Sequence, residues 1–306
     1  MEDIRRNFDL ENIDSINMMD YAFFKADTLY TIKTLQNLGL ISSQKKCLCG
    51  TMMHPISSKN SQDLYFFRCP DCKTKQNLRV GSIFEHSNLP LWKLFIFFVV
   101  KIQFSKITYE EIQNHIQILS SKTIADWTEL LRSIITLKIT DERTKIGGKN
   151  VVVQIDETAV TRRKYNVGRL LKNQQYWIVG GIDDEGGCFF ELTKKRSSSV
   201  LETIILNNVE EESIIWTDKW RGYSRLNDIG FFHETVCHKY SFVSGTGVHT
   251  NKIEATWGGF KRRYRNITNK NEESLYDFIS DYIFRKKFQG KLLSTFYKEI
   301  MNNYVV

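Results

Sequence analysis

The chain has 306 residues, of which 42% are hydrophobic and 13% aromatic. This composition indicates a globular protein with at least one large core and excludes an intrinsically disordered chain. Lys and Arg number 43 against 35 Asp and Glu, a net charge of +8, which favours a polyanionic partner, although many soluble proteins are mildly basic. The N-terminus has no apolar signal region, and the longest apolar run, residues 94–100, is too short to span a bilayer. We therefore expect a soluble protein that is not secreted and that lies in a reducing compartment.

Changes of composition divide the chain into five segments. Two segments carry apolar residues at helical spacing, and the segment between them contains two close pairs of Cys. At Gly147-Gly148 the pattern becomes rich in β-strands. We expect an N-terminal helical segment, a Cys-bearing module, a second helical segment, an α/β domain and a C-terminal tail, at residues 1–44, 45–86, 87–146, 147–290 and 291–306.

The Cys-bearing module contains Cys47 and Cys49, then Cys69 and Cys72. Two thiolate pairs on turns can close a tetrahedral zinc site, and Zn²⁺ would stabilise a module too small for its own core. The second pair has the two-residue spacer typical of a zinc ribbon, whereas the first pair is tighter, and His54 could replace one of its thiols. Four unligated thiols remain the alternative.

The second helical segment contains a helix-turn-helix pattern. Residues 108–118 and 122–135 have helical periodicity, and Ser120 or Ser121 between them can cap the second helix. The early residues of that helix would face the major groove of DNA. Plain packing of two antiparallel helices explains the same pattern, so both interpretations stay open.

The α/β domain begins with residues 151–155, a continuous apolar run typical of a central strand. Further strands, a helix and a closing helix follow, at residues 176–182, 188–192, 197–206, 213–217, 232–237 and 251–265. Three sequential strands followed by alternating helices and strands is the order of an RNase H-like mixed sheet. Cys188 and Cys237 fall in these strands and are expected to be buried as small apolar residues.

Three acids occupy compatible places in this order. Asp156 directly follows the first strand, Asp218 directly follows the fourth, and Glu254 lies one turn into the last helix. Such carboxylates can bind two Mg²⁺ or Mn²⁺ ions about 4 Å apart, one activating the attacking oxygen and one stabilising the leaving oxygen of an in-line displacement. Each acid taken alone is better explained by solvation of the sheet edge or by helix capping, and the metal-binding interpretation depends on all three falling in compatible places. Glu157 points to the opposite face of its strand if the strand continues, so we leave it out.

Three blocks of residues carry a family resemblance. They are Gln-Ile-Asp-Glu-Thr at 154–158, Trp-Thr-Asp at 216–218 with Gly222-Tyr223, and His-Thr-Asn-Lys-Ile-Glu at 249–254 with Trp257 and Phe260-Lys261. On these blocks, residues 45 to about 285 resemble the Merlin-type cut-and-paste DNA transposases and their bacterial insertion-sequence relatives, a branch of the DDE superfamily. The resemblance implies that the three acids form the metal-binding triad and that a zinc ribbon precedes the catalytic core.

The resemblance also implies DNA contacts around the triad. Lys261 lies two helical turns beyond Glu254 and would reach a DNA phosphate, and Arg262 continues the same basic helix. His249 and Asn251 would lie beside the metal site and contact DNA or orient ligands, although Asn251 could equally cap the last helix. The basic residues 161–172, between the first two strands, either follow a phosphate backbone or form a solvated loop.

The implied activity is cleavage of transposon ends and their joining to target DNA. The implied partner is double-stranded DNA, with the protein as a homo-oligomer in the complex that pairs two ends. The chain would then act in the nucleus of a eukaryotic host, or in the cytoplasm or nucleoid of a bacterial one. Two alternatives remain, a domesticated transposase that only binds DNA and a nuclease of the same fold that cuts without joining.

Overall fold

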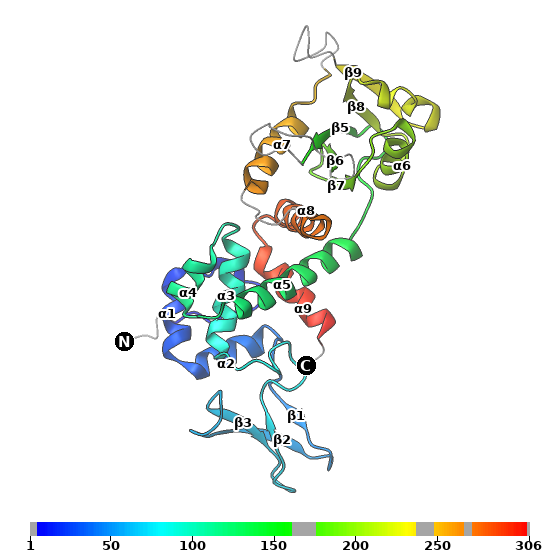
Figure 1. Ribbon diagram of the computed structural model, residues 1–306. Coiled ribbons are helices and arrows are strands. Elements are labelled where there is room, and N and C mark those ends of the chain that lie inside the picture. Colours follow the sequence, from blue (N-terminus) through cyan, green and yellow to red (C-terminus); the bar gives the residue numbers. More distant parts are fainter. Residues whose placement is uncertain (1–4, 161–175, 237–247, 266–270, 305–306) are drawn as a thin grey trace. The chain divides into compact units, whose positions relative to one another are not determined.

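The computed structural model describes residues 5–160, 176–236, 248–265 and 271–304 (Figure 1). The chain divides into two compact units, which are described separately below. Unit 1 comprises Met1–Ile135 and Phe288–Val306, and unit 2 comprises Thr136–Lys287. The finer division into five segments stays a prediction. Over the described residues, no helix is both long enough and apolar enough to cross a membrane.

Unit 1 is built around one apolar helix. Helix α3 (Leu91–Gln103) contains the longest apolar run of the chain, and most of its residues are buried, as expected for a helix that is hydrophobic all round. It contacts the surrounding helices α1, α2, α4 and α9. The helical elements of unit 1 are η1 (Ile13–Ser15), α1 (Met18–Ala26), α2 (Thr28–Asn37), α3, α4 (Tyr109–Ile116), the first part of α5 (Ser121–Asp141) and α9 (Leu292–Asn303).

The segment expected as a C-terminal tail is mostly helical. It forms α9, whose apolar side chains, including Phe296 and Tyr297, are buried in unit 1. Phe296 packs against Phe98 of α3 at 5.5 Å between ring centroids. A single short amphipathic helix carries no sequence signal that it returns to an N-terminal core, because its partner helix is about 200 residues away in the chain.

The Cys-bearing module of unit 1 is a small antiparallel sheet with the order β1-β2-β3-β4 (Figure 1). Its strands are β1 (Lys45–Lys46), β2 (Met52–Ser57), β3 (Tyr65–Arg68) and β4 (Lys75–Asn77). Arg79 follows β4 and forms a bidentate ion pair with Asp63, Nε to Oδ2 at 2.7 Å and Nη2 to Oδ1 at 2.5 Å. Their side chains are 0% and 2% exposed, so this pair is part of the module's interior.

The predicted pair of helices at 108–135 is present as α4 and α5. Thr108 and Glu111 form a capping box at the start of α4, and Gln117 ends that helix in a left-handed conformation with φ of 61°. The Ser120 hydroxyl accepts from the backbone N–H of Thr123 at 3.2 Å, so Ser120 is the cap of α5. This geometry is common to DNA-binding and purely structural helix pairs, so the DNA-binding role stays a prediction.

Unit 2 contains a mixed sheet with the order β7-β6-β5-β8-β9. β5, β6 and β7 are successive antiparallel strands, whereas β8 and β9 run parallel to β5. The predicted order of three sequential strands followed by alternating helices and strands is therefore confirmed. The elements are β5 (Val152–Ala159), β6 (Trp177–Asp183), β7 (Cys188–Thr193), α6 (Ser198–Asn208), β8 (Ile214–Asp218), η4 (Arg221–Tyr223), η5 (Leu226–Ile229), β9 (Phe232–Val236), α7 (Asn251–Tyr264) and α8 (Glu272–Lys287).

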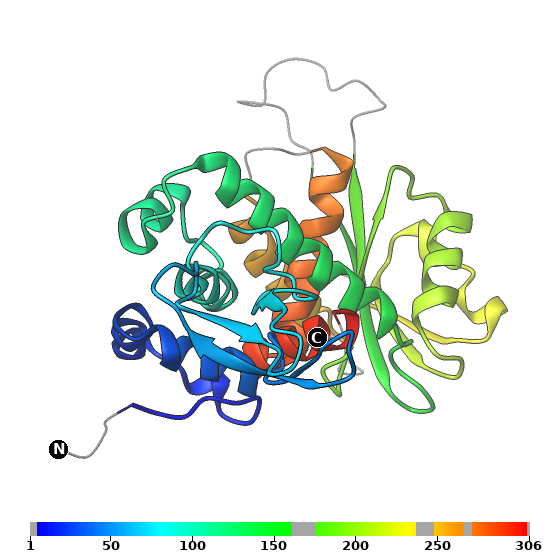
Figure 2. The same cartoon turned by 90° about the horizontal axis from the view of Figure 1, so that it is seen from below.

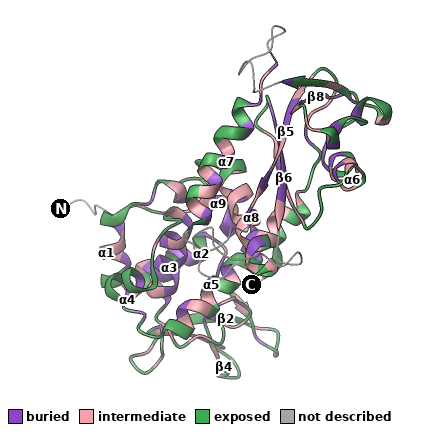
Figure 3. Ribbon diagram, turned by 45° about the horizontal axis from the view of Figure 1, so that its top comes forward, coloured by how far each residue is buried: buried purple, intermediate pink, exposed green. Residues whose placement is uncertain are grey.

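Both faces of this sheet are covered. On one face, Val153 and Ile155 of β5 pack with Leu201 and Ile205 of α6. On the other face, residues of β6 and β7 pack against α7 and α8, with Trp257 and Phe260 at the centre. Figure 2 shows α6 and α8 on opposite sides of the sheet, and Figure 3 shows the buried residues concentrated along β5 and β6. Two-sided burial explains why these strands are continuous apolar runs.

Candidate active site

Asp156 and Asp218 lie at the same level of adjacent parallel strands. The β5–β8 register pairs Gln154 with Trp216, and each acid is two residues further along its strand. Since side chains alternate, both acids point to the same face of the sheet. Asp218 is the last residue of β8, whereas it was expected to follow that strand directly. The expectation that β5 ends before Asp156 is wrong, because pairing with β6 continues to Ala159 and places Asp156 opposite Gly180.

The carboxyl of Asp156 is held in an environment that disfavours its charge. Burial, together with the negative charges of Glu157 and Asp218, raises its pKa to about 6. One oxygen, Oδ2, accepts a hydrogen bond from Trp257 Nε1 at 2.9 Å. A divalent cation beside the two Asp would relieve both the repulsion and the desolvation.

Gly180 makes the contact between Trp257 and Asp156 possible. A Cβ atom at this position would lie 2.7 Å from Cη2 of the Trp257 indole and 2.8 Å from the Phe190 ring. Because real Cβ atoms do not approach so closely, only Gly lets the indole lie against the sheet. The residue opposite the acid therefore determines whether the ring can reach it.

Helix α7 is attached to β5 through Gln154. This side chain is 1% exposed, and its Oε1 accepts from the backbone N–H groups of Lys252 at 2.9 Å and Ile253 at 3.4 Å. The N-cap residue, Thr250, makes no side-chain capping bond, so Gln154 satisfies the helix from outside its sequence. The alternative that Asn251 caps α7 is wrong, because Asn251 is already the first residue of the helix.

Glu254 lies in the first turn of α7 and is exposed. Its Oε1 accepts from the Thr250 hydroxyl at 2.7 Å. Glu254 is one turn before Trp257, the residue that donates a hydrogen bond to Asp156. Among the described residues, the one group of three or more His, Cys, Asp or Glu side chains close enough to share an ion is the Cys cluster, so the three acids do not form such a group here.

The predicted DNA-contacting residues lie around this helix. The His249 ring contacts Trp216 edge-on, 5.2 Å between centroids, and its Nδ1 is 3.4 Å from Gln154 Nε2. Lys261 is half-buried and Arg262 is exposed, both in the last turns of α7. The predicted basic segment 161–172 and residue Cys237 lie outside the described residues.

The sequence interpretation missed a second group of side chains, on the other face of β5. Glu157 points there, as expected for an alternating strand, and accepts from the Tyr223 hydroxyl at 2.6 Å and from Arg196 Nη1 at 3.2 Å. Burial raises the pKa of Glu157. Tyr223 is 1% exposed and belongs to the Gly-Tyr motif at residues 222–223. The motif therefore singled out Tyr223 in the sequence but did not indicate that Glu157 is its partner.

Gly222 and Trp220 complete the arrangement around Asp218. The backbone N–H of Trp220 donates to Asp218 Oδ1 at 2.9 Å. A Cβ atom on Gly222 would lie 2.5 Å from the Trp220 indole, so the motif requires Gly for the ring to fold back over the chain. Both Asp side chains thus have one oxygen fixed by an N–H donor, an arrangement that orients metal ligands in other proteins.

The four predicted zinc ligands come together in unit 1. The sulfur atoms of Cys47, Cys49, Cys69 and Cys72 all lie within 4.8 Å of one another, and His54 is not part of the group. Two of the separations are 3.4 Å. Tetrahedral zinc with bonds of about 2.3 Å places sulfur atoms about 3.8 Å apart, so the set fits Zn²⁺. The pKa of Cys72 is lowered to about 6, first by the Thr74 hydroxyl, which is 3.1 Å from its sulfur, and then by the Thr74 backbone and the Cys47 and Cys69 side chains, so the thiolate is favoured.

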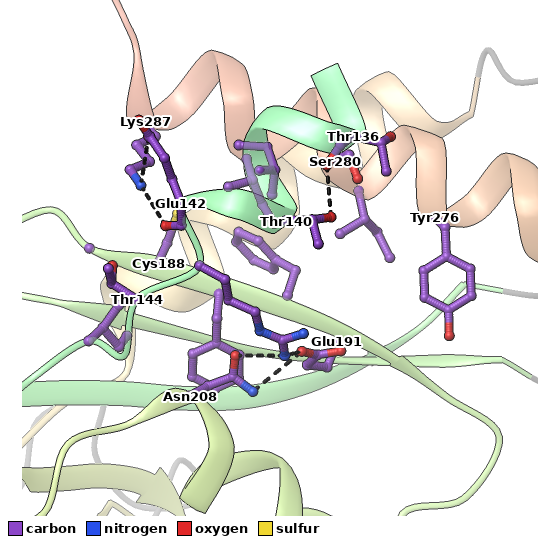
Figure 4. A pocket seen from close by; sticks show the side chains of 18 of the residues that line it. Thr136, Thr140, Glu142, Thr144, Cys188, Glu191, Asn208, Tyr276, Ser280 and Lys287 are labelled. Carbon is purple, nitrogen blue, oxygen red and sulfur yellow. Dashed lines mark hydrogen bonds and ion pairs between the residues drawn. The ribbon is translucent and has the colours of Figure 1, made fainter. Parts of the chain in front are cut away.

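A separate cavity of 390 Å³ lies in unit 2, between the end of α5, β7 and α8 (Figure 4). Its charged side chains are already paired, Arg143 with Glu191 and Lys287 with Glu142. None of the predicted site residues lines it. This cavity therefore has no evident part in the chemistry of the acids.

Comparison with known proteins gives one family match. Residues 135–286, just under half of the chain, match the model of the ISXO2-like transposase domain. The matched segment contains the whole sheet of unit 2 and the three acids. No curated protein matches the chain.

Among the solved structures that are similar at a low level, two are complexes of the Mos1 transposase. They are the Mos1 transposase paired-end complex with left transposon end, at 10% identity over 66% of this chain and 78% of that chain with a TM-score of 0.23, and the Mos1 strand transfer complex, at 10% identity over 69% and 75% with a TM-score of 0.30. Similarity at this level carries no argument about fold or function. The family match supports a DDE-type transposase domain over residues 135–286.

Proposed function

We propose that the chain is a DNA transposase that cleaves transposon ends and joins them to target DNA. Unit 2 would be an RNase H-like catalytic domain, with Asp156, Asp218 and Glu254 holding two Mg²⁺ or Mn²⁺ ions. One observation carries the proposal. Two carboxylates stand at the same level of adjacent parallel strands, and the charge of one is disfavoured until a cation joins them.

The side chains around the acids suit this role. Trp257 fixes one oxygen of Asp156 and leaves the other for a ligand, and the Trp220 N–H does the same for Asp218. When bound, two divalent ions activate an attacking oxygen and stabilise a leaving oxygen on phosphorus. Glu254 supplies a third carboxylate from a helix whose position is set by β5.

DNA contacts would follow from the same helix. Lys261 and Arg262 in the last turns of α7 would bind backbone phosphates, and His249 and Asn251 at its start would bind DNA or orient the acids. The helix pair α4–α5 is a second candidate surface for double-stranded DNA. We further propose that the protein is a homo-oligomer when it holds two ends, that it acts in the compartment that contains its DNA, and that it is of the Merlin type, as its motifs resemble.

The Cys cluster would be a structural zinc ribbon. Its strands are too short to bury a core of their own, and the metal would join the two Cys-bearing turns. The fit of the four sulfur atoms to tetrahedral geometry supports this assignment.

The test uses the full chain with Mg²⁺ or Mn²⁺, labelled DNA carrying the gene's own flanking ends, and a plasmid target. We expect cleaved and joined products that disappear in Glu254→Gln but persist in Glu273→Gln, an exposed acid in the first turn of α8. Binding without cleavage in the unaltered chain would identify a domesticated DNA-binding protein. Cleavage without joining would identify a nuclease. Wild-type activity of Glu254→Gln would remove this residue from the mechanism.

A further inference from the structure

The Arg196 guanidinium lies over two aromatic rings. Its guanidinium carbon lies 4.0 Å from the centre of the Trp177 ring and 4.8 Å from the centre of the Trp220 ring. Nη1 also donates to Glu157 at 3.2 Å. Stacked and ion-paired in this way, the side chain has little rotational freedom left to lose when it binds a further group.

Part of the Arg196 side chain remains accessible to solvent. The side chain of Arg196 is 41% exposed, whereas that of Glu157 is 7% exposed. Glu157 also receives the Tyr223 hydroxyl, so Arg196 is not its sole partner. A guanidinium has five N–H donors, and the bond to Glu157 uses one of them.

Arg196 is linked to both Asp residues of the proposed site. Glu157, which pairs with Arg196, directly follows Asp156 in β5. Trp220, which covers one face of the guanidinium, donates its backbone N–H to Asp218 at 2.9 Å. Two of the three residues that contact Arg196 are therefore joined to the acids, Glu157 covalently to Asp156 and Trp220 by a hydrogen bond to Asp218.

We propose that Arg196 binds a backbone phosphate of the DNA strand that enters the acidic site. This inference rests on the proposed function, because it takes DNA as the substrate. The fork of a guanidinium matches two oxygens of a phosphate, and its fixed orientation favours one place along the strand. The positive charge would also offset the repulsion between the acids and the phosphate that approaches them.

The test measures binding and its salt dependence, without cleavage. The full chain in EDTA is titrated against a fluorescent 30-base-pair duplex of random sequence at KCl concentrations from about 50 to 200 mM. Loss of one phosphate contact lowers the slope of log affinity against log salt by about 0.9. We expect this decrease, and about eightfold weaker binding at about 0.1 M salt, in Arg196→Gln.

The control is Arg225→Gln. Arg225 is also an exposed arginine paired with a glutamate, Glu202 at 3.7 Å, and none of its recorded contacts is a stacked ring. The slope of log affinity against log salt for Arg225→Gln should equal that of the unaltered chain. An unchanged slope in Arg196→Gln, even with a lower melting temperature, would show a purely structural role and overturn the proposal, as would an equal decrease in Arg225→Gln.

A conservative variant keeps the test sharp if Arg196→Gln does not fold. Arg196→Lys retains the charge but loses the planar fork. It should keep the slope of the unaltered chain while binding about fivefold more weakly. Unchanged affinity in this variant would contradict the proposed geometry. Because no step is catalysed in EDTA, these results stay separate from the cleavage assay that tests the proposed function.

Discussion

Replacing Asp156 with Asn should stabilise the metal-free protein while abolishing its proposed chemistry. In the folded state the pKa of Asp156 is raised to about 6 by burial and by neighbouring negative charges, from an ordinary value of 3.8. Above about pH 6 the side chain is charged in both states, and the folded state bears the cost of that charge. Between about pH 6 and pH 4 the folded state binds a proton that the unfolded state does not, so folding becomes more favourable as the pH falls.

The size of the effect follows from the same values. The difference between the two pKa values of Asp156 corresponds to at most about 3 kcal/mol of unfolding free energy. Solvent around the half-buried side chain reduces this free energy, so we expect a gain of about 1–3 kcal/mol. Asn is isosteric, and its Oδ1 can still accept the hydrogen bond from Trp257 Nε1. The gain should therefore be present at about pH 7.5 and vanish near about pH 4.

The assay is urea unfolding in EDTA at several pH values. The control is Asp228→Asn, an exposed acid in η5, for which the change should stay within about 0.5 kcal/mol. Addition of Mg²⁺ should stabilise the unaltered chain and leave Asp156→Asn unaffected, because a ligand that binds only the folded state raises its stability. If Asp156→Asn is no more stable than the unaltered chain at about pH 7.5, the reasoning about its environment is refuted.

Three further changes test other parts of the structure. Cys69→Ser should remove bound zinc and unfold the Cys-bearing module, seen as loss of zinc in elemental analysis and of a thermal transition; retained zinc would refute the assignment. Gly180→Ala should displace the Trp257 indole and lower the free energy of unfolding by about 1–3 kcal/mol, checked by chemical denaturation and Trp fluorescence. Asp63→Ala should leave Arg79 charged and buried without its partner. The free energy of unfolding should then fall by about 3–5 kcal/mol, whereas a change below about 1 kcal/mol would show that water reaches the pair.

The sequence was sufficient for the strands and helices from β5 to α7 and for their order, but not for α8 or α9. Apolar runs with flanking turns predict strands such as β6 and β8, and helical spacing predicts α6 and α7, because these signals are local. The end of β5 was not predictable, since residues 156–159 are Asp-Glu-Thr-Ala, which have no apolar strand pattern and become a strand only through pairing with β6. Strand pairing is non-local and overrides local composition.

The candidate site was predictable only in part. Motif spacing marks Asp156 and Asp218, and the parallel register explains why they meet. The cap of α7 was assigned to Asn251, because a polar residue at a helix start is the local signal, whereas the bond actually comes from Gln154, about 100 residues earlier. Arg196 lies in no motif, and the proposal that it binds a phosphate depends on the two rings beside it in the structure.

The attachment of α7 to β5 has a mechanical consequence. Gln154 accepts a backbone hydrogen bond from the first turn of the helix, and Asp156 lies two residues further along the same strand. A distortion of residues 154–156 would move Asp156 and Glu254 together. We therefore expect the spacing between these two acids to change little when other parts of unit 2 move. Hydrogen exchange can report on this coupling, since the amide protons of Lys252 and Ile253 should exchange as slowly as those of the central strand.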